Sequence, residues 1–152
     1  MQPSLWQPPI EPSGTEQAIL KRIKRAKLFV FLREHRHELF DAAFQQELAG
    51  LYQASQRGQP PIPPAQLAEA SILQAYTGAS DDEVIEAMTM DRRWQVVLDC
   101  VDAQEPPFSK GTLIAFRKRL IDTQMDRRLI ERTIELARET GGFGAGQPAR
   151  RL

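Results

Sequence analysis

The sequence predicts an all-α fold: a compact multi-helix domain with a helix-turn-helix-like segment and a disordered amino-terminal arm. Apolar residues recur at steps of three and four along most of the chain, which is the period of one face of a helix. No segment shows the apolar and polar alternation that is typical of strands. With 152 residues, of which 41% are hydrophobic, the chain can bury a real core.

The amino-terminal part is expected to be an arm followed by a helical pair. Residues 1–14 contain four prolines and little periodicity, so they are predicted to be extended and partly disordered, with Trp6 docking on the body or on a partner. A helical pattern then begins at Thr15 and continues to Phe31, and a second begins at about Glu38. Residues 15–57 are therefore predicted to hold two helices.

A proline-rich connector is predicted over residues 58–65, where Gly58 is followed by four prolines. We interpret it as a boundary between two subdomains, the second being a helical region over residues 66–140. The remaining residues, 141–152, are predicted to form a flexible tail.

The second region carries clear helix boundaries. Pro64 suits a first helical turn, and Gly78 suits the end of that helix. Ser80 begins the next helix as part of a capping box, "SDDE". After a short helix around "DRRWQVVLD", Ser109 caps another, and a last helix is expected over residues 126–140. The total is six or seven helices.

Charged residues are unevenly distributed although the twenty basic and twenty acidic residues cancel. Residues 21–37 carry seven Lys or Arg against one acid, and residues 110–132 carry seven against three. Residues 38–105 reverse this balance, with twelve acids against three bases. We interpret two basic segments around an acidic middle as an electrostatic layout.

Several classes of function are disfavoured by what the sequence contains. Cys100 is the only cysteine, and His35 and His37 are the only histidines, so the chain alone assembles neither a disulfide framework nor a Cys/His zinc site. We interpret Cys100 as a buried apolar residue and the histidines as surface or intersegment residues. There is no glycine-rich phosphate loop and no nucleophile with a plausible base. We expect no catalytic centre, no metal and no cofactor.

A membrane location is also not expected. No stretch approaches the roughly 20 uncharged apolar residues of a membrane span, and the first residues lack the features of a signal peptide. The prediction is a cytoplasmic protein without a membrane partner.

The segment "QAYTGASDDEVIEAM" has the spacing of a helix-turn-helix, with Gly78 in the turn and Ser80 as the cap of the second helix. Acidic residues crowd the end of that helix which would approach phosphates. Because acids suit the positive end of a helix dipole, we interpret the segment as scaffold.

The helix after Ser109, "KGTLIAFRKRL", divides into two faces when its residues are placed at 100° steps. The inward face is expected to hold Leu113, Ile114, Phe116, Leu120 and Ile121. The outer face is expected to hold Gly111, Thr112, Ala115, Lys118 and Arg119. Arg117 falls on the inward side, where we expect it to pair with Asp122 or Glu105.

That outer face is the principal candidate for contact with DNA, through Lys110, Thr112, Lys118 and Arg119, since hydroxyls and long cations contact phosphates and base edges. The opposing interpretation is a core helix with a solvated cationic face. The early helix is a weaker second candidate, through Lys21, Lys24 and Arg25 beside Arg22. A charge run of this kind is often only a solvated surface.

Three runs suggest a family. The first, "PPIPPAQLAEASILQAYTGASDDEVIEAMTMDRRWQVVLDC", is followed by "PPFSKGTLIAFRKRL" and "DRRLIERTIELARETGGFG". Together with "LFVFLREHRHELFDAAFQQEL" they resemble the amino-terminal region of bacterial insertion-sequence transposases of the IS5/IS1182 type, over roughly residues 15–144. The run from Ser109 to Leu120 is the most specific part of the resemblance.

The resemblance implies that this helical region, residues 66–140 above all, binds the terminal repeats of a mobile element. In the family a catalytic domain follows, whose Asp-Asp-Glu carboxylates hold two Mg²⁺ ions, whereas here no Asp or Glu lies beyond Glu139. We therefore expect no residue with a catalytic role. A natural truncation, a frameshift and an isolated domain all fit this pattern.

The expected partners are DNA and either a second copy of the chain or a full-length transposase. The alternative to DNA binding is a helical module that pairs transposase subunits without touching DNA. Salt dependence separates the two, because phosphate contacts weaken steeply with salt and an apolar seam does not.

Overall fold

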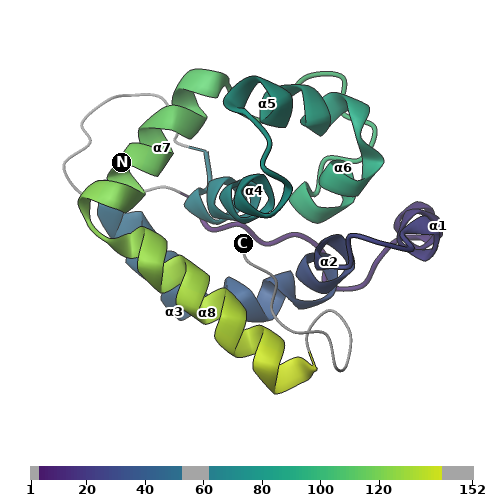
Figure 1. The fold of residues 1–152 in the computed structure, drawn as a ribbon, viewed down its shortest axis with the longest axis horizontal. Helices are drawn as coiled ribbons and strands as arrows, with labels where there is room; N and C mark the ends of the chain where they lie inside the picture. Colours follow the sequence, from purple (N-terminus) through teal and green to yellow (C-terminus); the bar gives the residue numbers. More distant parts are fainter. Residues whose placement is uncertain (1–3, 53–61, 142–152) are drawn as a thin grey trace.

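The helices account for most of the residues that the computed structural model describes, which are 4–52 and 62–141 (Figure 1). Within these ranges there is no strand, so the all-α prediction is confirmed. The elements in chain order are α1 (Gly14–Arg22), α2 (Leu28–Leu39), α3 (Ala42–Ala49), the 3-10 turn η1 (Gly50–Tyr52), α4 (Pro64–Thr77), α5 (Asp81–Met90), α6 (Arg92–Leu98), α7 (Lys110–Asp122) and α8 (Met125–Thr140).

Helix boundaries in the second half follow the capping residues. Pro64 is the first residue of α4, and Gly78 ends that helix with a φ of 74°, in the left-handed region that favours glycine. The Ser80 hydroxyl accepts from the Glu83 amide while the Glu83 carboxylate accepts from the Ser80 amide, which completes the capping box of α5. Ser109 caps α7, as predicted, because its hydroxyl accepts from the Thr112 amide. These boundaries are confirmed.

The first half differs from its prediction. The expected continuous helix from Thr15 to Phe31 is wrong, because α1 ends at Arg22 and α2 begins at Leu28. The link between them turns through Ala26, whose φ is 43°. Ile23 and Leu28, on either side of this turn, are both buried. Two helices whose apolar residues stay in phase have the same periodicity as one, so the pattern did not reveal the break.

The second expected helix also begins later than predicted. α2 continues to Leu39, and α3 starts after Asp41, whose carboxylate accepts from the Phe44 amide as an N-cap. Residues 14–52 thus form three α-helices and a 3-10 turn. α1 is capped by Ser13, whose hydroxyl accepts a hydrogen bond from the Glu16 amide.

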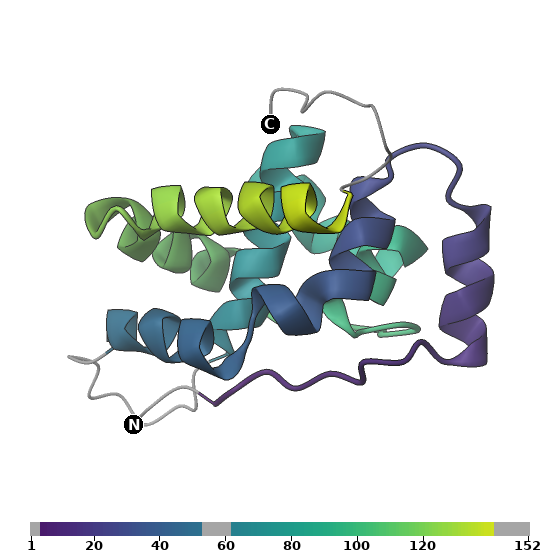
Figure 2. The same ribbon diagram turned by 90° about the horizontal axis from the view of Figure 1, so that it is seen from below.

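α4 lies at the centre of the molecule, and most of its side chains are buried (Figures 1 and 2). It contacts α2, α3, α5, α6 and α7, and one hydrophobic core runs through elements on both sides of the predicted connector. α1 and α7 lie toward opposite ends of the long axis in both views. This separation matters because the first basic segment begins at the end of α1 and the second begins at the start of α7.

The arm over residues 4–13 is extended and crosses the body beneath α2 and α3 (Figure 2). Trp6 is buried. The side-chain NH2 group of Gln45 donates to the Trp6 carbonyl oxygen at 2.9 Å, and the side-chain oxygen of Gln45 accepts from the Trp6 backbone amide at 2.7 Å. The buried guanidinium groups of Arg33 and Arg36 donate to carbonyl oxygens farther along the arm. The docking of Trp6 on the body is confirmed.

Two expected features fall partly or wholly outside the described residues. The connector over 58–65 is described only from Ile62, and the tail is described only at Gly141.

Among the described helices, none combines the length and the apolar composition that a membrane span requires.

Two buried charged residues lie between the arm, α2, α4 and α6. Arg36 donates to the carbonyl oxygens of Val96 and Val97, at 3.1 and 2.8 Å, and burial lowers the pKa of Arg36 to about 10. Glu69 is fully buried, and burial raises its pKa well above the ordinary value. Because both groups are enclosed by the fold, neither is available to a macromolecular partner.

Candidate nucleic-acid interface

α7 packs through a narrower face than the sequence predicts. Leu113, Phe116 and Leu120 are buried, at steps of three and four along the helix. The expectation that Ile114 and Ile121 also point inward is wrong, since they are 40% and 56% exposed. They lie outside the stripe that contacts α4, α5 and α8, so the outer face of α7 is more apolar than predicted.

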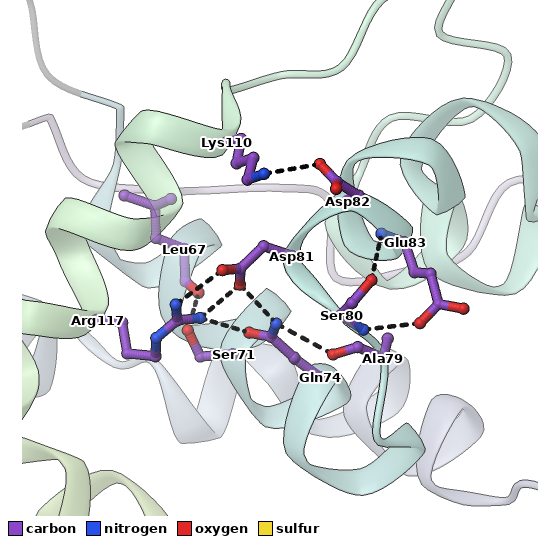
Figure 3. Close-up of polar contacts among 10 residues, drawn as sticks. All are labelled: Leu67, Ser71, Gln74, Ala79, Ser80, Asp81, Asp82, Glu83, Lys110 and Arg117. Carbon is purple, nitrogen blue, oxygen red and sulfur yellow. Dashed lines mark hydrogen bonds and ion pairs between the residues drawn. The ribbon is translucent and has the colours of Figure 1, made fainter.

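Arg117 holds α7 against α5, as Figure 3 shows. Its guanidinium donates to both carboxylate oxygens of Asp81, at 2.6 and 2.9 Å, and to Gln74 at 3.2 Å. The partner is therefore neither Asp122 nor Glu105, and that prediction is wrong. These hydrogen bonds, with a further one from Gln74, hold the pKa of Asp81 well below its ordinary value.

The first turn of α7 also faces an acid of α5. The Lys110 ammonium lies 3.0 Å from the Asp82 carboxylate (Figure 3). The Thr112 hydroxyl is within 3.0 Å of the Ser109 hydroxyl that caps the helix. The acidic start of α5 therefore stands beside the end of α7 that would approach phosphates, which supports the interpretation of the helix-turn-helix-like segment as scaffold.

The two remaining candidates on α7 differ in exposure. Lys118 points outward, where it pairs with Asp122 at 2.9 Å along the same helix. Arg119 is half-buried: it lies 4.4 Å from the centre of the Tyr52 ring and donates to the Leu51 carbonyl oxygen. The prediction that Arg119 lies on the outer face is therefore wrong, because Leu51 and Tyr52 of η1 cover it.

The second candidate set has no such internal partners. Lys21, Lys24 and Arg25 are exposed, and so is Arg22. None of the four makes a side-chain hydrogen bond or an ion pair with another described residue. They lie at the end of α1 and in the link that follows it.

Three of these cations border an open groove of about 620 Å³ between α1, the link and the start of α6. Two further cations line it from α6, and we call the five residues Arg22, Lys24, Arg25, Arg92 and Arg93 the basic groove. The lining includes one acid, Asp91, which accepts two hydrogen bonds from the Arg93 guanidinium, at 3.1 and 2.7 Å. Lys21 precedes the groove and does not line it.

Arg92 and Arg93 are functional candidates that the sequence analysis missed. They are about seventy positions from the link, within the acidic middle of the chain. The only available signal was the adjacent pair of arginines in "DRRW", and it did not indicate which surface they join. Contacts between α1 and α6 bring them to the groove.

The described side chains show no arrangement that would support metal catalysis. No group of three or more His, Cys, Asp or Glu in residues 4–52 and 62–141 could hold a metal ion. His35 is within 2.6 Å of Glu38, and burial raises the pKa of the Cys100 thiol to about 11, which disfavours a thiolate nucleophile.

Comparison with known protein families identifies the family of this chain. Residues 18–119 match the model of the transposase domain family DUF772, which covers more than half of the sequence and includes α2 to α6 and the basic groove. The chain therefore belongs to this transposase domain family. Neither the curated proteins nor the solved structures provide a significant match.

Proposed function

We propose that this chain is a non-catalytic, DNA-binding region of a transposase that recognises the ends of an insertion sequence of the IS5/IS1182 type. The family match supports the link to transposition. The observation that carries DNA binding is the group of exposed cations at Lys21, Arg22, Lys24 and Arg25, which have no partners among the described residues.

Unpaired lysines and arginines are suited to phosphate contact. Each cation that neutralises a phosphate releases condensed counterions, which supplies much of the free energy of protein–DNA association. A cation already held by a carboxylate must first give up that pair. Lys21, Lys24 and Arg25 are therefore the favoured contacts of the proposed interface.

The α7 residues take a secondary place in this proposal. Lys110, Thr112 and Lys118 can reach a duplex only in competition with Asp82, Ser109 and Asp122. Such exposed ion pairs contribute about 0–1 kcal/mol each, so DNA can displace them. Arg119 would have to leave Tyr52, and we assign it to packing.

The test is fluorescence anisotropy with a labelled duplex carrying a terminal inverted repeat of the parent element, against a random duplex of equal length. We expect submicromolar to micromolar binding at low salt, a preference for the repeat, and affinity that falls linearly with salt on a logarithmic plot. If neither duplex binds at low salt, the proposal fails.

One observation favours the assembly module as an alternative function. Ile114 and Ile121 are exposed on the same helix, and such residues can form an apolar seam between subunits. Sedimentation velocity distinguishes the two functions. A dimer that persists at high salt, and that Ile121→Asp dissociates, together with no affinity for DNA, would favour assembly.

A further inference from the structure

We infer that the basic groove is a clamp for the phosphate backbone of DNA that does not read base sequence, and that Arg22, Arg92 and Arg93 belong to it. The inference rests on the proposed function and adds to it. It names the chemical group that the groove binds, and it assigns sequence discrimination to some other surface of the chain or its parent protein.

Charge in the groove is strongly one-sided. Five cations line it from α1, the link and α6, and the lining carboxylate, Asp91, is already bonded by Arg93. Asp102, which is not part of the lining, pairs with Arg92 at 3.2 Å in a largely exposed contact. Such an exposed pair contributes little, so an anion can displace Asp102 from Arg92, as it can displace the acids paired with the cations of α7. Arg22, Lys24 and Arg25, which have no partner among the described residues, need no such exchange.

Apart from its cations and Thr15, which contact phosphates as well as base edges, the groove holds few side chains that read bases. Besides charged residues, its lining consists of Thr15, Ala18, Ile19, Ile23 and Ala26. Asn and Gln, which bond adenine edges, are absent from this described lining, and so are the aromatic rings on which unpaired bases stack. An open groove lined by apolar side chains and exposed cations suits a polyanionic strand that lies across it.

Two features shape the groove before a ligand arrives. The Arg93 guanidinium lies 4.8 Å from the centre of the Phe29 ring while bonding Asp91, so its position is fixed. The left-handed backbone at Ala26 turns the chain sharply after Lys24 and Arg25. Non-glycine residues held at positive φ often lie at functional sites, because the surrounding structure must support the strain.

The test uses the double variant Arg22→Gln with Arg92→Gln, and the matched control Arg127→Gln with Arg138→Gln on the exposed side of α8. Anisotropy titrations across a salt series measure affinity for the inverted-repeat duplex and for a random duplex. Circular dichroism and melting temperature establish that both variants fold.

If both arginines contact phosphates, the groove variant loses about tenfold or more in affinity at ~0.1 M salt, and its salt slope becomes shallower by about 1.8. The loss is the same for both duplexes, so the preference for the repeat is unchanged, and the control binds like the wild type.

Three results would overturn the inference while leaving DNA binding intact: an unchanged salt slope in the groove variant, a loss confined to the inverted repeat, or an equal loss in the control. Absence of binding by the wild type would instead remove the proposed function. The wild type could instead bind polyglutamate or vesicles of anionic lipid and show no affinity for DNA. If that binding depends on the same arginines, the groove belongs to another anion, and this result would also contradict the inference.

Discussion

The two basic regions of this chain contain the same residue types but differ in what those residues contact. On α7, all four cations have internal partners: Lys110 with Asp82, Arg117 with Asp81, Lys118 with Asp122 and Arg119 with Leu51 and Tyr52. At the end of α1, Lys21, Arg22, Lys24 and Arg25 have none among the described residues. Charge density along a sequence therefore does not indicate which cations are available to a partner.

The largest expected effect comes from reversing charge at the groove. Lys24→Glu with Arg25→Glu should lower affinity for DNA by about a hundredfold at low salt, because two phosphate contacts become two repulsions. Both side chains are exposed, so the melting temperature should change little. The matched variant Lys110→Glu with Lys118→Glu on α7 should lose much less affinity. Equal losses in the two variants, measured by anisotropy, would remove the distinction between the regions.

A second effect concerns the fold and separates Arg117 from the binding surface. Arg117→Ala breaks the paired hydrogen bonds to Asp81, and the pair is partly exposed, so we expect a loss of about 1–2 kcal/mol in the free energy of unfolding. Urea denaturation measures this loss. Asp81→Ala combined with Arg117→Ala should cost less than the sum of the single variants, and strict additivity would show that the pair contributes nothing.

A third effect tests the assignment of Arg119 to packing. Arg119→Ala removes the contact with the Tyr52 ring and the hydrogen bond to Leu51, which should cost about 1 kcal/mol of stability. Lys118→Ala, the neighbouring control, should change stability by no more than about 0.5 kcal/mol. If Arg119→Ala lowers DNA affinity and leaves the melting temperature unchanged, Arg119 is a contact residue.

Acid should weaken the α5–α7 contact. The pKa of Asp81 is held below its ordinary value of 3.8 by the hydrogen bonds from Arg117 and Gln74, so the carboxylate is stabilised in the folded chain. This contribution is fully present above the unfolded pKa and is lost as pH falls below about 4 toward the folded pKa. In thermal melts across this range, Asp81→Asn should lose less stability than the wild type. Parallel pH profiles would contradict the assignment.

The smallest effect lies at the turn before α2. Glycine adopts the φ of 43° at Ala26 without strain, but it also increases the freedom of the unfolded chain. Ala26→Gly should therefore shift the free energy of unfolding by less than about 1 kcal/mol. DNA affinity should fall modestly, because Lys24 and Arg25 become less ordered. A strong loss of stability would show that Ala26 is not strained.

Local features of the fold could be predicted from the sequence, while features that depend on packing could not. Gly78, Ser80 and Ser109 determine helix boundaries through contacts within a few residues, so their roles follow from short patterns. The break at Ala26 and the pairing of Arg117 with Asp81 depend on how helices meet, thirty-six positions apart in the latter case.

The candidate site shows the same division. A local run of charge is enough to identify Lys21, Lys24 and Arg25 as candidates, but it does not show that they have no internal partners among the described residues while the cations of α7 do. Arg92 and Arg93 could not be connected to that run, since the fold alone brings α6 against α1. The apolar pattern of α7 likewise did not show that Ile114 and Ile121 lie outside its packing stripe.

The central claim is that the α1 side of the molecule is the main contact surface for DNA and that α7 is secondary. At 17.2 kDa the chain is suited to a two-dimensional NMR titration with a duplex that carries the terminal repeat. The account predicts that the amide resonances that shift first and furthest belong to residues 21–26 and 91–93. Shifts concentrated instead in residues 109–119, with the α1 side unchanged, would contradict it.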